Sequence, residues 1–324
     1  MVSTLATMLD CIDPELLQVE RLFDQELRSD LACMNNLTRH VSRFRGKMLR
    51  PILVLLSGRA CGQLTHDHVV LATVVEMVHM ATLVHDDVLD EAELRRKGAT
   101  LNHLRGNEAA VLLGDFLISH SYHLCSSIGS QFASRTIAHT TNEVCEGELL
   151  QIDNRNNYNL SQETYFQIIT RKTASLCGAC CLLGAKFADE SDATATSMER
   201  FGRRIGEAFQ IQDDVLDLIG DARAVGKTLG TDINKGKMTL PMIHFMQTAP
   251  SQHRELLRSL LAGHEPDKAE KIRNLIIPSE SIAFARTKAR LLVQEAIDAL
   301  SCLKDSPSRQ ALRTAAEFVV DRPV

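Results

Sequence analysis

The five-residue sequence DDVLD occurs twice in this chain, at residues 86–90 and at residues 213–217. Each copy follows an apolar stretch with helical periodicity, so each is expected near the C-terminal end of a helix. Helical spacing places the aspartates of each copy on one patch about one turn (~5.4 Å) long. Like charges repel one another there, and a helix C-terminus disfavours anions as well. Stability therefore does not explain this arrangement.

Binding of a hard divalent cation does explain clustered carboxylates. Mg²⁺ takes one or two carboxylates, keeps several waters and completes its shell with substrate phosphates. Two such clusters indicate a group of ions that holds one polyphosphate, and neither copy has the D-x-D-x-D-G spacing of an EF-hand loop. The predicted Mg²⁺ ligands are Asp86, Asp87, Asp90, Asp213, Asp214 and Asp217.

Basic residues beside turn signals supply the counter-charge that a polyphosphate needs. They are Lys47, Arg50, Arg95, Arg96, Lys172, Lys227 and Lys237. Long loops are expected near 92–106 and 220–239, and long loops in compact domains tend to be functional. The GKT at 226–228 does not end a P-loop, because that motif needs glycine where this chain has Asp221. The residues thus predict an Mg²⁺-dependent enzyme in which metal ions help to remove a diphosphate from carbon.

The elements that must position these groups all read as helices. The apolar period is near 3.6, no segment reads as a strand, and no linker rich in Pro, Ser or Gly divides the chain. We therefore predict a single large all-α domain over residues 1–324. Helices are expected from Asp13, over about 51–61, 65–91, 107–128, 134–150, 161–185 and 196–219, and from 240 to 318 with breaks near Pro250, Pro266, Pro278 and Pro307.

Composition excludes several classes of protein. The net charge of −5 argues against a general nucleic-acid binder. The nine cysteines and an N-terminus without a secretory signal favour reduced thiols in a cytoplasmic protein. The longest apolar stretch, 69–84, contains Glu76 and His79, so we interpret it as a core helix and expect no transmembrane segment.

Several motifs resemble those of the trans-isoprenyl diphosphate synthases, the polyprenyl synthetase family. They occur in the family's order: GKMLRP (46–51), VHMATLVHDDVLDEAELRRKGATLN (78–102), GELLQ (147–151), RKTASL (171–176), FQIQDDVLD (209–217) and GKTLGTDINKGKMTLP (226–241). The resemblance extends from about Phe44 to the C-terminal FVVDRPV. The family's usual GGKRxRP is altered at Arg45 and Met48, whereas Lys47 and Arg50 keep their spacing.

The resemblance implies a helical bundle around a deep apolar cavity, the isoprenoid synthase-like fold, usually as a homodimer. It implies a head-to-tail 1'-4 condensation. Metal ions, expected as three Mg²⁺ that Mn²⁺ can replace, ionise an allylic diphosphate to a carbocation. The double bond of isopentenyl diphosphate attacks the carbocation, and a proton is lost. Nucleic acid is not an expected partner, and a transient membrane contact would accompany release of the product.

The family's site residues carry over by matching position. Lys47, Arg50, His79 and Arg96 resemble the isopentenyl-diphosphate site. Arg95, Lys172, Thr173, Gln210, Lys227 and Lys237 resemble the allylic-diphosphate site. Among these, Lys172, Thr173 and Gln210 are the expected catalytic residues, with Thr173 and Gln210 against the allylic carbon.

Product length in this family depends on the helix just before the first aspartates. The positions concerned here are Met77, Val78, Ala81 and Thr82, and none is aromatic. Short-chain enzymes typically place an aromatic residue where this chain has Ala81 and Thr82. The cavity should therefore continue for at least about two turns, ~11 Å. We expect a product longer than C20, in the C30 to C50 range of quinone side chains.

Four alternatives remain beside this interpretation. A short-chain farnesyl or geranylgeranyl synthase differs only in product length. A class I terpene cyclase would carry Asn/Asp-x-x-Ser/Thr-x-x-x-Glu, whereas 213–221 reads DDVLDLIGD. A phosphohydrolase built on His85 and Asp86 leaves the second DDVLD unexplained. A non-catalytic synthase subunit would be expected to lose aspartates from one copy. Incubation with Mg²⁺, isopentenyl diphosphate and an allylic primer separates the last three from a synthase.

Overall fold

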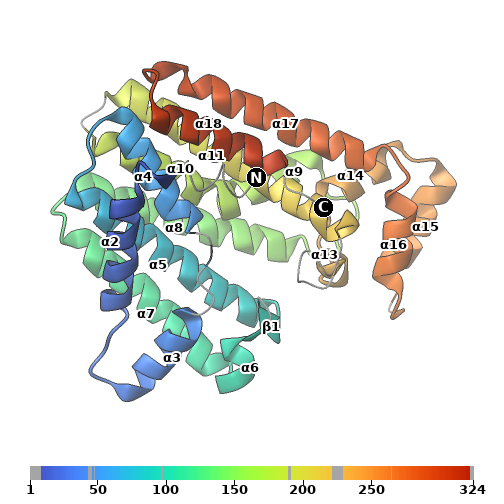
Figure 1. Ribbon diagram of the computed structural model, residues 1–324. Helices are drawn as coiled ribbons and strands as arrows, with labels where there is room; N and C mark the ends of the chain where they lie inside the picture. Colours follow the sequence, from blue (N-terminus) through green and yellow to red (C-terminus); the bar gives the residue numbers. More distant parts are fainter. Residues whose placement is uncertain are drawn as a thin grey trace. The chain divides into compact units, whose positions relative to one another are not determined.

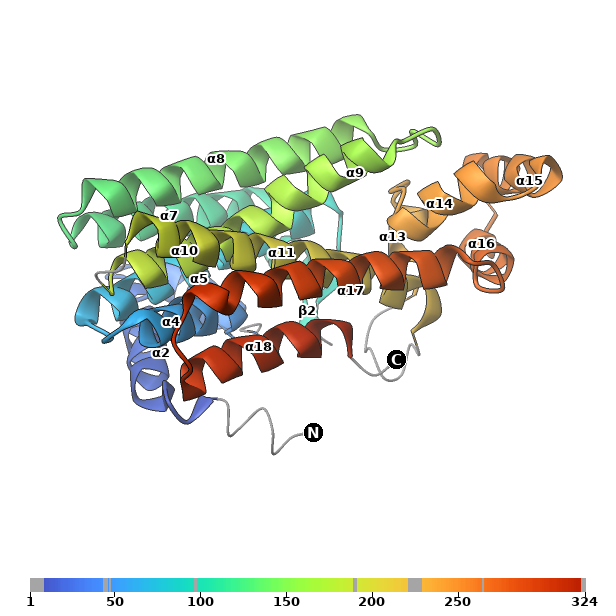
Figure 2. The same cartoon turned by 90° about the horizontal axis from the view of Figure 1, so that it is seen from above.

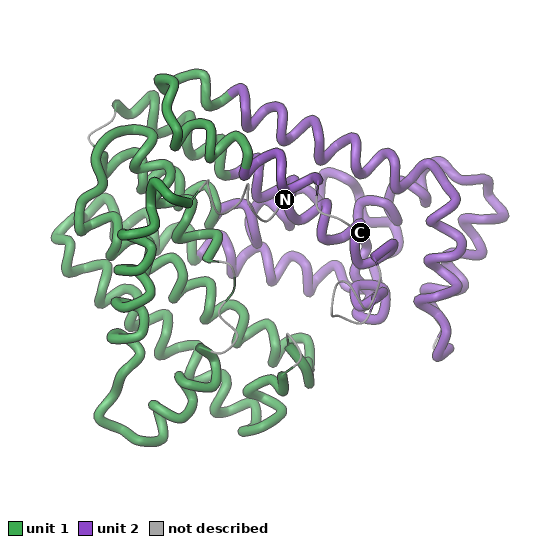
Figure 3. Tube along the Cα trace, viewed as in Figure 1, with its two compact units in different colours: residues 1–141, 176–202, 299–314 green, residues 142–175, 203–298, 315–324 purple. Residues whose placement is uncertain are grey.

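The structure, a computed structural model, describes residues 9–42, 46, 48–95, 98–188, 191–220, 229–263 and 265–321. Figures 1 and 2 show its helices from two directions. The chain divides into two compact units, which are described separately (Figure 3). The first unit comprises 1–141, 176–202 and 299–314, and the second comprises 142–175, 203–298 and 315–324. The single-domain interpretation stays a prediction.

The first unit holds most of the N-terminal helices. Its elements are α2 (Asp13–Glu26), α3 (Ala32–Ser42), α4 (Leu49–Cys61), α5 (His66–Leu89), β1 (Leu94–Arg95), β2 (Gly98–Ala99), α6 (Leu101–Arg105), α7 (Asn107–Ser126), nearly all of α10 (Ser175–Lys186) and the short η2 (Leu300–Cys302). Helices α8 (Gln131–Asp153), α11 (Asp192–Ile219) and α18 (Pro307–Val320) contribute residues to both units.

The second unit holds the other helices. Its elements are α9 (Gln162–Ile169), the π-helical turn η1 (Thr170–Ala174), α13 (Thr231–Asn234), α14 (Leu240–Thr248), α15 (Ser251–Ala262), α16 (Lys268–Ile276) and nearly all of α17 (Ser281–Ala299). The all-α prediction is confirmed, and the expected helices are present. The expectation of no strand is wrong at one place, where Leu94 pairs with Ala99 and Arg95 with Gly98. Strands of two residues are too short to leave an alternating pattern in the sequence.

Helix α5 is the core of the first unit. It packs against α7, α4 and α2, and most of its valines are fully or nearly fully buried. A helix that is apolar on all sides belongs inside a protein or a membrane. Among the described residues, α5 and the run Gln162–Lys186 are long and apolar enough to cross a membrane, yet 78% and 72% of these stretches are buried inside the protein. Burial of this extent is that of core helices.

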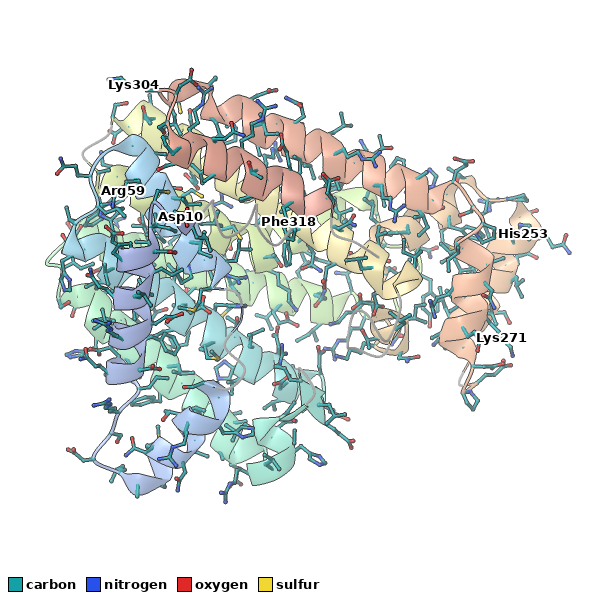
Figure 4. The ribbon with its side chains drawn as sticks, in the orientation of Figure 1. Asp10, Arg59, His253, Lys271, Lys304 and Phe318 are labelled. Atoms are coloured by element: carbon teal, nitrogen blue, oxygen red, sulfur yellow. The ribbon has the colours of Figure 1, made fainter. Side chains whose placement is uncertain are left out.

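A buried histidine fixes the start of α5. The backbone N–H of Thr65 donates to Nδ1 of His68 at 3.0 Å, so the ring proton sits on Nε2, which donates to the Gly184 carbonyl of α10 at 3.0 Å. Burial lowers the pKa of His68, which favours the neutral ring that this bonding needs. Arg59 of α4, labelled in Figure 4, pairs with a carboxylate of α2, and its guanidinium lies 2.6 Å from Glu15.

The three cysteines of α10 have a packing role. Cys177, Cys180 and Cys181 are buried, and burial raises the pKa of each thiol. A raised pKa keeps the thiol neutral and unreactive. All nine cysteines of the chain are free, as the sequence predicts.

Helices α10 and α4 approach closely at Gly184. A Cβ at this position would lie 2.3 Å from the Val54 carbonyl oxygen and 2.9 Å from the Ser57 Cβ. The first of these atoms belongs to the backbone of α4, so the clash cannot be relieved by rotating a side chain. Glycine is therefore required for this helix contact.

We expect Gly184→Ala to lower the free energy of unfolding by about 1–3 kcal/mol, as overpacking does in cores. The measurement is the urea midpoint followed by circular dichroism. Gly263→Ala is the control, because a Cβ there meets atoms no closer than 3.4 Å, and we expect a change within about 0.5 kcal/mol. Equal midpoints for the two variants would contradict this description of the contact.

Candidate active site

The first acidic cluster, Asp86, Asp87 and Asp90, lies at the end of α5. The helix ends at Leu89, Asp90 occupies the C-cap, and Glu91 turns the chain with a left-handed φ of 49°. Asp86 and Asp90 are half-buried, and Asp87 is buried. The sequence prediction of carboxylates at a helix end is confirmed.

Arg95 of β1 compensates the charge of Asp87. Its Nε lies 2.9 Å from Oδ1 and 3.0 Å from Oδ2, and a terminal nitrogen lies 2.8 Å from Oδ1. Such forked pairs are the strong form of an ion pair. Asn102, which follows the hairpin, donates to the backbone carbonyls of Asp87 and Ala92, at 3.1 Å each. Sequence reasoning assigned Asn102 no role, although it ends the motif KGATLN.

Residues expected at the isopentenyl-diphosphate site lie in α4 and α5. Arg50 is half-buried in the first turn of α4, and Met48 precedes that helix with a left-handed φ of 53°. Residues held in such conformations cluster at functional sites. His79 is half-buried on α5, seven residues before Asp86. The structure brings Arg95 to the first acidic cluster, whereas Lys47, Arg96 and Lys227 lie outside the described residues.

The residues expected to set product length lie farther back on α5. Met77, Val78 and Ala81 are fully buried. Thr82 is half-buried, and its hydroxyl donates to the His79 carbonyl at 2.8 Å. These four positions are therefore buried or half-buried, and none carries an aromatic ring.

The second acidic cluster, Asp213, Asp214 and Asp217, lies in the last turns of α11. Asp217 accepts bonds from the backbone N–H groups of Thr231 and Asp232, at 3.2 Å each, and from the Thr231 hydroxyl at 2.9 Å. The start of α13 therefore holds this carboxylate. Asp213 is half-buried.

Asp214 is the buried member of the second cluster. One of its oxygens accepts a bond from the Tyr165 hydroxyl at 2.6 Å, and the other accepts a bond from the Gln210 amide at 2.8 Å. The Thr173 hydroxyl donates to the amide oxygen of Gln210 at 3.0 Å. Burial raises the pKa of Asp214 well above its usual value, the charge of Asp232 adds to this, and the two donors oppose it. The structure thus joins Thr173, Gln210 and Asp214, and sequence reasoning missed Tyr165.

Lys172 and Thr173 lie in the π-helical turn η1, a feature that is frequent at functional sites. The ammonium group of Lys172 donates to Gln151 of α8 at 2.9 Å and pairs with Glu148 of the same helix. Gly147 permits this approach, since a Cβ there would lie 2.5 Å from the Lys172 backbone nitrogen. Gly147, Glu148 and Gln151 all belong to the motif GELLQ, and this motif could have indicated their role.

Asp232 adds a further carboxylate beside the second cluster. Its pKa is raised to about 6 by burial and by the charge of Asp217, while the ammonium groups of Lys237 and Lys235 lower it. Lys237, an expected diphosphate ligand, therefore lies where its charge acts on this cluster. Sequence reasoning did not select Asp232, although it lies in the quoted motif GTDINKG.

The Nε2 atom of His85 faces α7. Its Nε2 lies 3.2 Å from the Val111 carbonyl and 3.4 Å from the Asp115 carboxylate, both on α7. Gly114 makes room for the ring, because a Cβ there would lie 2.1 Å from it. His85 therefore has a packing role between α5 and α7.

The donor set of both clusters suits a hard cation. Within the part of the chain that the structure describes, no group of three His, Cys, Asp or Glu side chains could hold a metal ion. Asp86 and Asp90 of the first cluster and Asp213 of the second are half-buried, Arg95 pairs with Asp87, and Lys237 acts on Asp232. An ion bound here must complete its shell with water or with phosphate oxygens, as Mg²⁺ does.

Comparison with known proteins identifies the family. The family model described as polyprenyl synthetase matches residues 32–277. The chain belongs to the polyprenyl synthetase family.

Relatives of this chain in the polyprenyl synthetase family include enzymes that are named for long products. The octaprenyl diphosphate synthase of Escherichia coli (strain K12) is 34% identical, with 92% of this chain and 93% of that protein covered. The solved decaprenyl diphosphate synthase of Rhodobacter capsulatus is 30% identical with a TM-score of 0.92 and covers 98% of each chain. The polyprenyl synthase of Caulobacter crescentus CB15, solved with calcium and isoprenyl diphosphate, is 31% identical with a TM-score of 0.92 and the same coverage.

Proposed function

We propose that this chain is a long-chain trans-polyprenyl diphosphate synthase. It would join isopentenyl diphosphate to an allylic diphosphate by 1'-4 condensation in the presence of Mg²⁺. The observation that carries the proposal is the pair of aspartate clusters at helix ends, each provided with basic residues. The names of the relatives support the same prenyltransferase activity.

The six predicted aspartates provide the proposed Mg²⁺ sites. Asp86, Asp90 and Asp213 are half-buried and would present oxygens to the ions directly. The carboxylates of Asp87, Asp214 and Asp217 already accept protein hydrogen bonds and would set the geometry of each cluster. Three ions, with Mn²⁺ able to replace Mg²⁺, is the expected stoichiometry. Calcium in the Caulobacter relative supports a hard divalent ion here.

The chemistry divides between the metal and the side chains. Bound Mg²⁺ supplies charge neutralisation for the diphosphate leaving group when the allylic C–O bond breaks. Lys172, with Arg95, Lys227 and Lys237, would hold the allylic diphosphate. Lys47, Arg50, His79 and Arg96 would hold isopentenyl diphosphate so that its double bond meets the allylic carbon. The uncharged oxygens of Thr173 and Gln210 would face the carbocation, because fixed dipoles stabilise developing charge.

Assembly, location and product release are proposed from surface features. Val111 and Leu112 of α7 are 40% and 68% exposed, and Phe132 of α8 is 42% exposed, which fits a homodimer contact. Nine free cysteines fit a reducing compartment, so we place the enzyme in the cytoplasm. A product of C30 to C50 would require transient membrane contact on release.

Both aspartate clusters should be needed for turnover. We expect Asp86→Ala and Asp213→Ala each to lower kcat by about 100-fold or more, since metal-assisted charge stabilisation contributes several kcal/mol. The assay is incorporation of labelled isopentenyl diphosphate at saturating Mg²⁺. Asp305→Ala, at an exposed aspartate on the first unit, serves as the control. Near-normal turnover in either cluster variant, with helix content intact, would contradict the metal assignment.

The two diphosphate sites should separate by residue. We expect Lys47→Ala and Arg50→Ala to raise KM mainly for isopentenyl diphosphate, and Lys172→Ala and Lys227→Ala mainly for the allylic primer. Loss of a charge-assisted hydrogen bond costs about 1.5–3 kcal/mol, or roughly 10–100-fold. Initial rates with one substrate varied at a time give both constants. If every variant affected both substrates equally, the two-site assignment would be wrong.

Product length should follow from the apolar surface of α5. We expect the wild-type product to exceed C20 and to lie between C30 and C50. Ala81→Phe should shorten it, because a ring would block the cavity about one and a half turns before the metals. Val78→Ala, the control on the same helix, should leave the length unchanged or increase it. The measurement is chromatography of the dephosphorylated products. A terminal wild-type product of C15 or C20 would contradict the long-chain proposal.

A further inference from the structure

A chain of three hydrogen bonds crosses the second unit and connects a residue without an assigned role to the expected catalytic residues. It runs from the Tyr165 hydroxyl to Asp214 (2.6 Å), from the Gln210 amide to Asp214 (2.8 Å), and from the Thr173 hydroxyl to Gln210 (3.0 Å). Tyr165 is 3% exposed and Asp214 is 4% exposed, so their bond is shielded from water, whereas Gln210 and Thr173 are half-buried. These hydrogen bonds therefore constrain the orientation of each of the four side chains.

The chemistry of the four side chains determines which group donates and which accepts in each hydrogen bond. The nitrogen of the Gln210 amide lies 2.8 Å from Oδ1 of Asp214, and an amide NH₂ group only donates hydrogen bonds. The amide oxygen of Gln210 then faces Thr173, whose hydroxyl has one proton and donates it there. The lone pairs of the Thr173 oxygen therefore remain as acceptors for a bound substrate.

This direction matters for the proposed function, on which the inference rests. A carbocation is stabilised by oxygen lone pairs and destabilised by hydroxyl or amide protons that point at it. A Thr173 hydroxyl that was free to rotate would reorganise when charge develops on the allylic carbon. Dipoles fixed in advance avoid that cost.

We infer that Tyr165 is a positioning residue for prenyl transfer, acting through Asp214 on the Gln210 amide and the Thr173 hydroxyl. The Tyr165 hydroxyl is the donor of the 2.6 Å bond to Asp214, since a tyrosine hydroxyl carries a proton that it can donate. Its bond helps to offset the cost of burying the Asp214 carboxylate. Without it, Asp214 has one fewer donor, and the orientation of Gln210 is less constrained.

Tyr165→Phe tests this role, because it keeps the ring and removes only the hydroxyl. We expect kcat to fall about tenfold, within the usual range for a hydrogen bond to a charged group. We expect KM for both diphosphates to stay within about threefold, because the change affects the transition state rather than substrate binding. Calorimetric titration with inorganic diphosphate and Mg²⁺ should give the wild-type Kd, which a general disturbance of the site would change.

Tyr158→Phe is the matched control in the same unit. It removes a tyrosine hydroxyl that donates to the Leu261 carbonyl at 3.0 Å, outside the chain of bonds. We expect its kcat to equal that of the wild type. Far-ultraviolet circular dichroism and melting curves on all variants exclude partial unfolding as the cause of a rate change.

A second pair of variants tests the direction of the chain independently of Tyr165. Thr173→Ser keeps a hydroxyl that can donate to Gln210, whereas Thr173→Val keeps the shape and removes both the proton and the lone pairs. We expect Ser to retain most of the wild-type kcat and Val to lose about tenfold or more. Equal rates for the two variants would overturn the proposed role of the hydroxyl.

The possible outcomes are distinct. Wild-type kcat in Tyr165→Phe, or a loss that higher Mg²⁺ or substrate restores, would overturn the positioning role, since the effect would then act through metal or substrate binding. If the wild type and Tyr158→Phe were both inactive, prenyl transfer itself would be refuted, and this assignment with it. An active wild type with an unaffected Tyr165→Phe refutes the assignment alone.

Discussion

Holding carboxylates close together is the constraint on which both acidic clusters depend. Unpaired buried charges are strongly unfavourable, and like charges on one helix turn repel. In each cluster the more buried carboxylate therefore receives donors from the protein. Arg95 holds Asp87 in the first cluster, and Tyr165 and Gln210 hold Asp214 in the second. Asp217 has its own support at the start of α13.

This compensation divides each cluster into two kinds of carboxylate. Asp87, Asp214 and Asp217 accept hydrogen bonds from other parts of the protein, and Asp86, Asp90 and Asp213 are the members that the proposed function places against a cation. The local structure follows from the same need. The hairpin delivers Arg95, the left-handed Glu91 follows the end of α5, and Asn102 binds the backbone carbonyls of Asp87 and Ala92. Elements that look like irregular connections thus serve the acidic cluster directly.

Sequence alone predicted the helices and the two aspartate clusters, because both depend on local spacing. The apolar periodicity of the sequence corresponds to helices α5 and α11, and the DDVLD repeat can be read directly from the sequence. The contacts of Tyr165 and Asn102 could not be predicted, because they join residues 49 and 15 positions apart. The two-residue strands and the π turn were not predicted, because neither produces a periodic pattern of apolar residues. The left-handed conformation of Met48 was not predicted, because a sequence indicates that conformation only at a glycine or an asparagine.

The π turn shows how tertiary contact decides a local conformation. One extra residue in the turn η1 changes the direction of the following side chains, and such a bulge is normally less stable than regular helix. Here α8 compensates it, because Gly147 admits the Lys172 backbone while Glu148 and Gln151 bind its ammonium group. Beside it, Thr173 bonds to Gln210 of α11, and Thr170 bonds to Glu207 of α11 at 2.7 Å. The turn is thus fixed from two helices, so Lys172 and Thr173 can face different partners although they are adjacent in sequence.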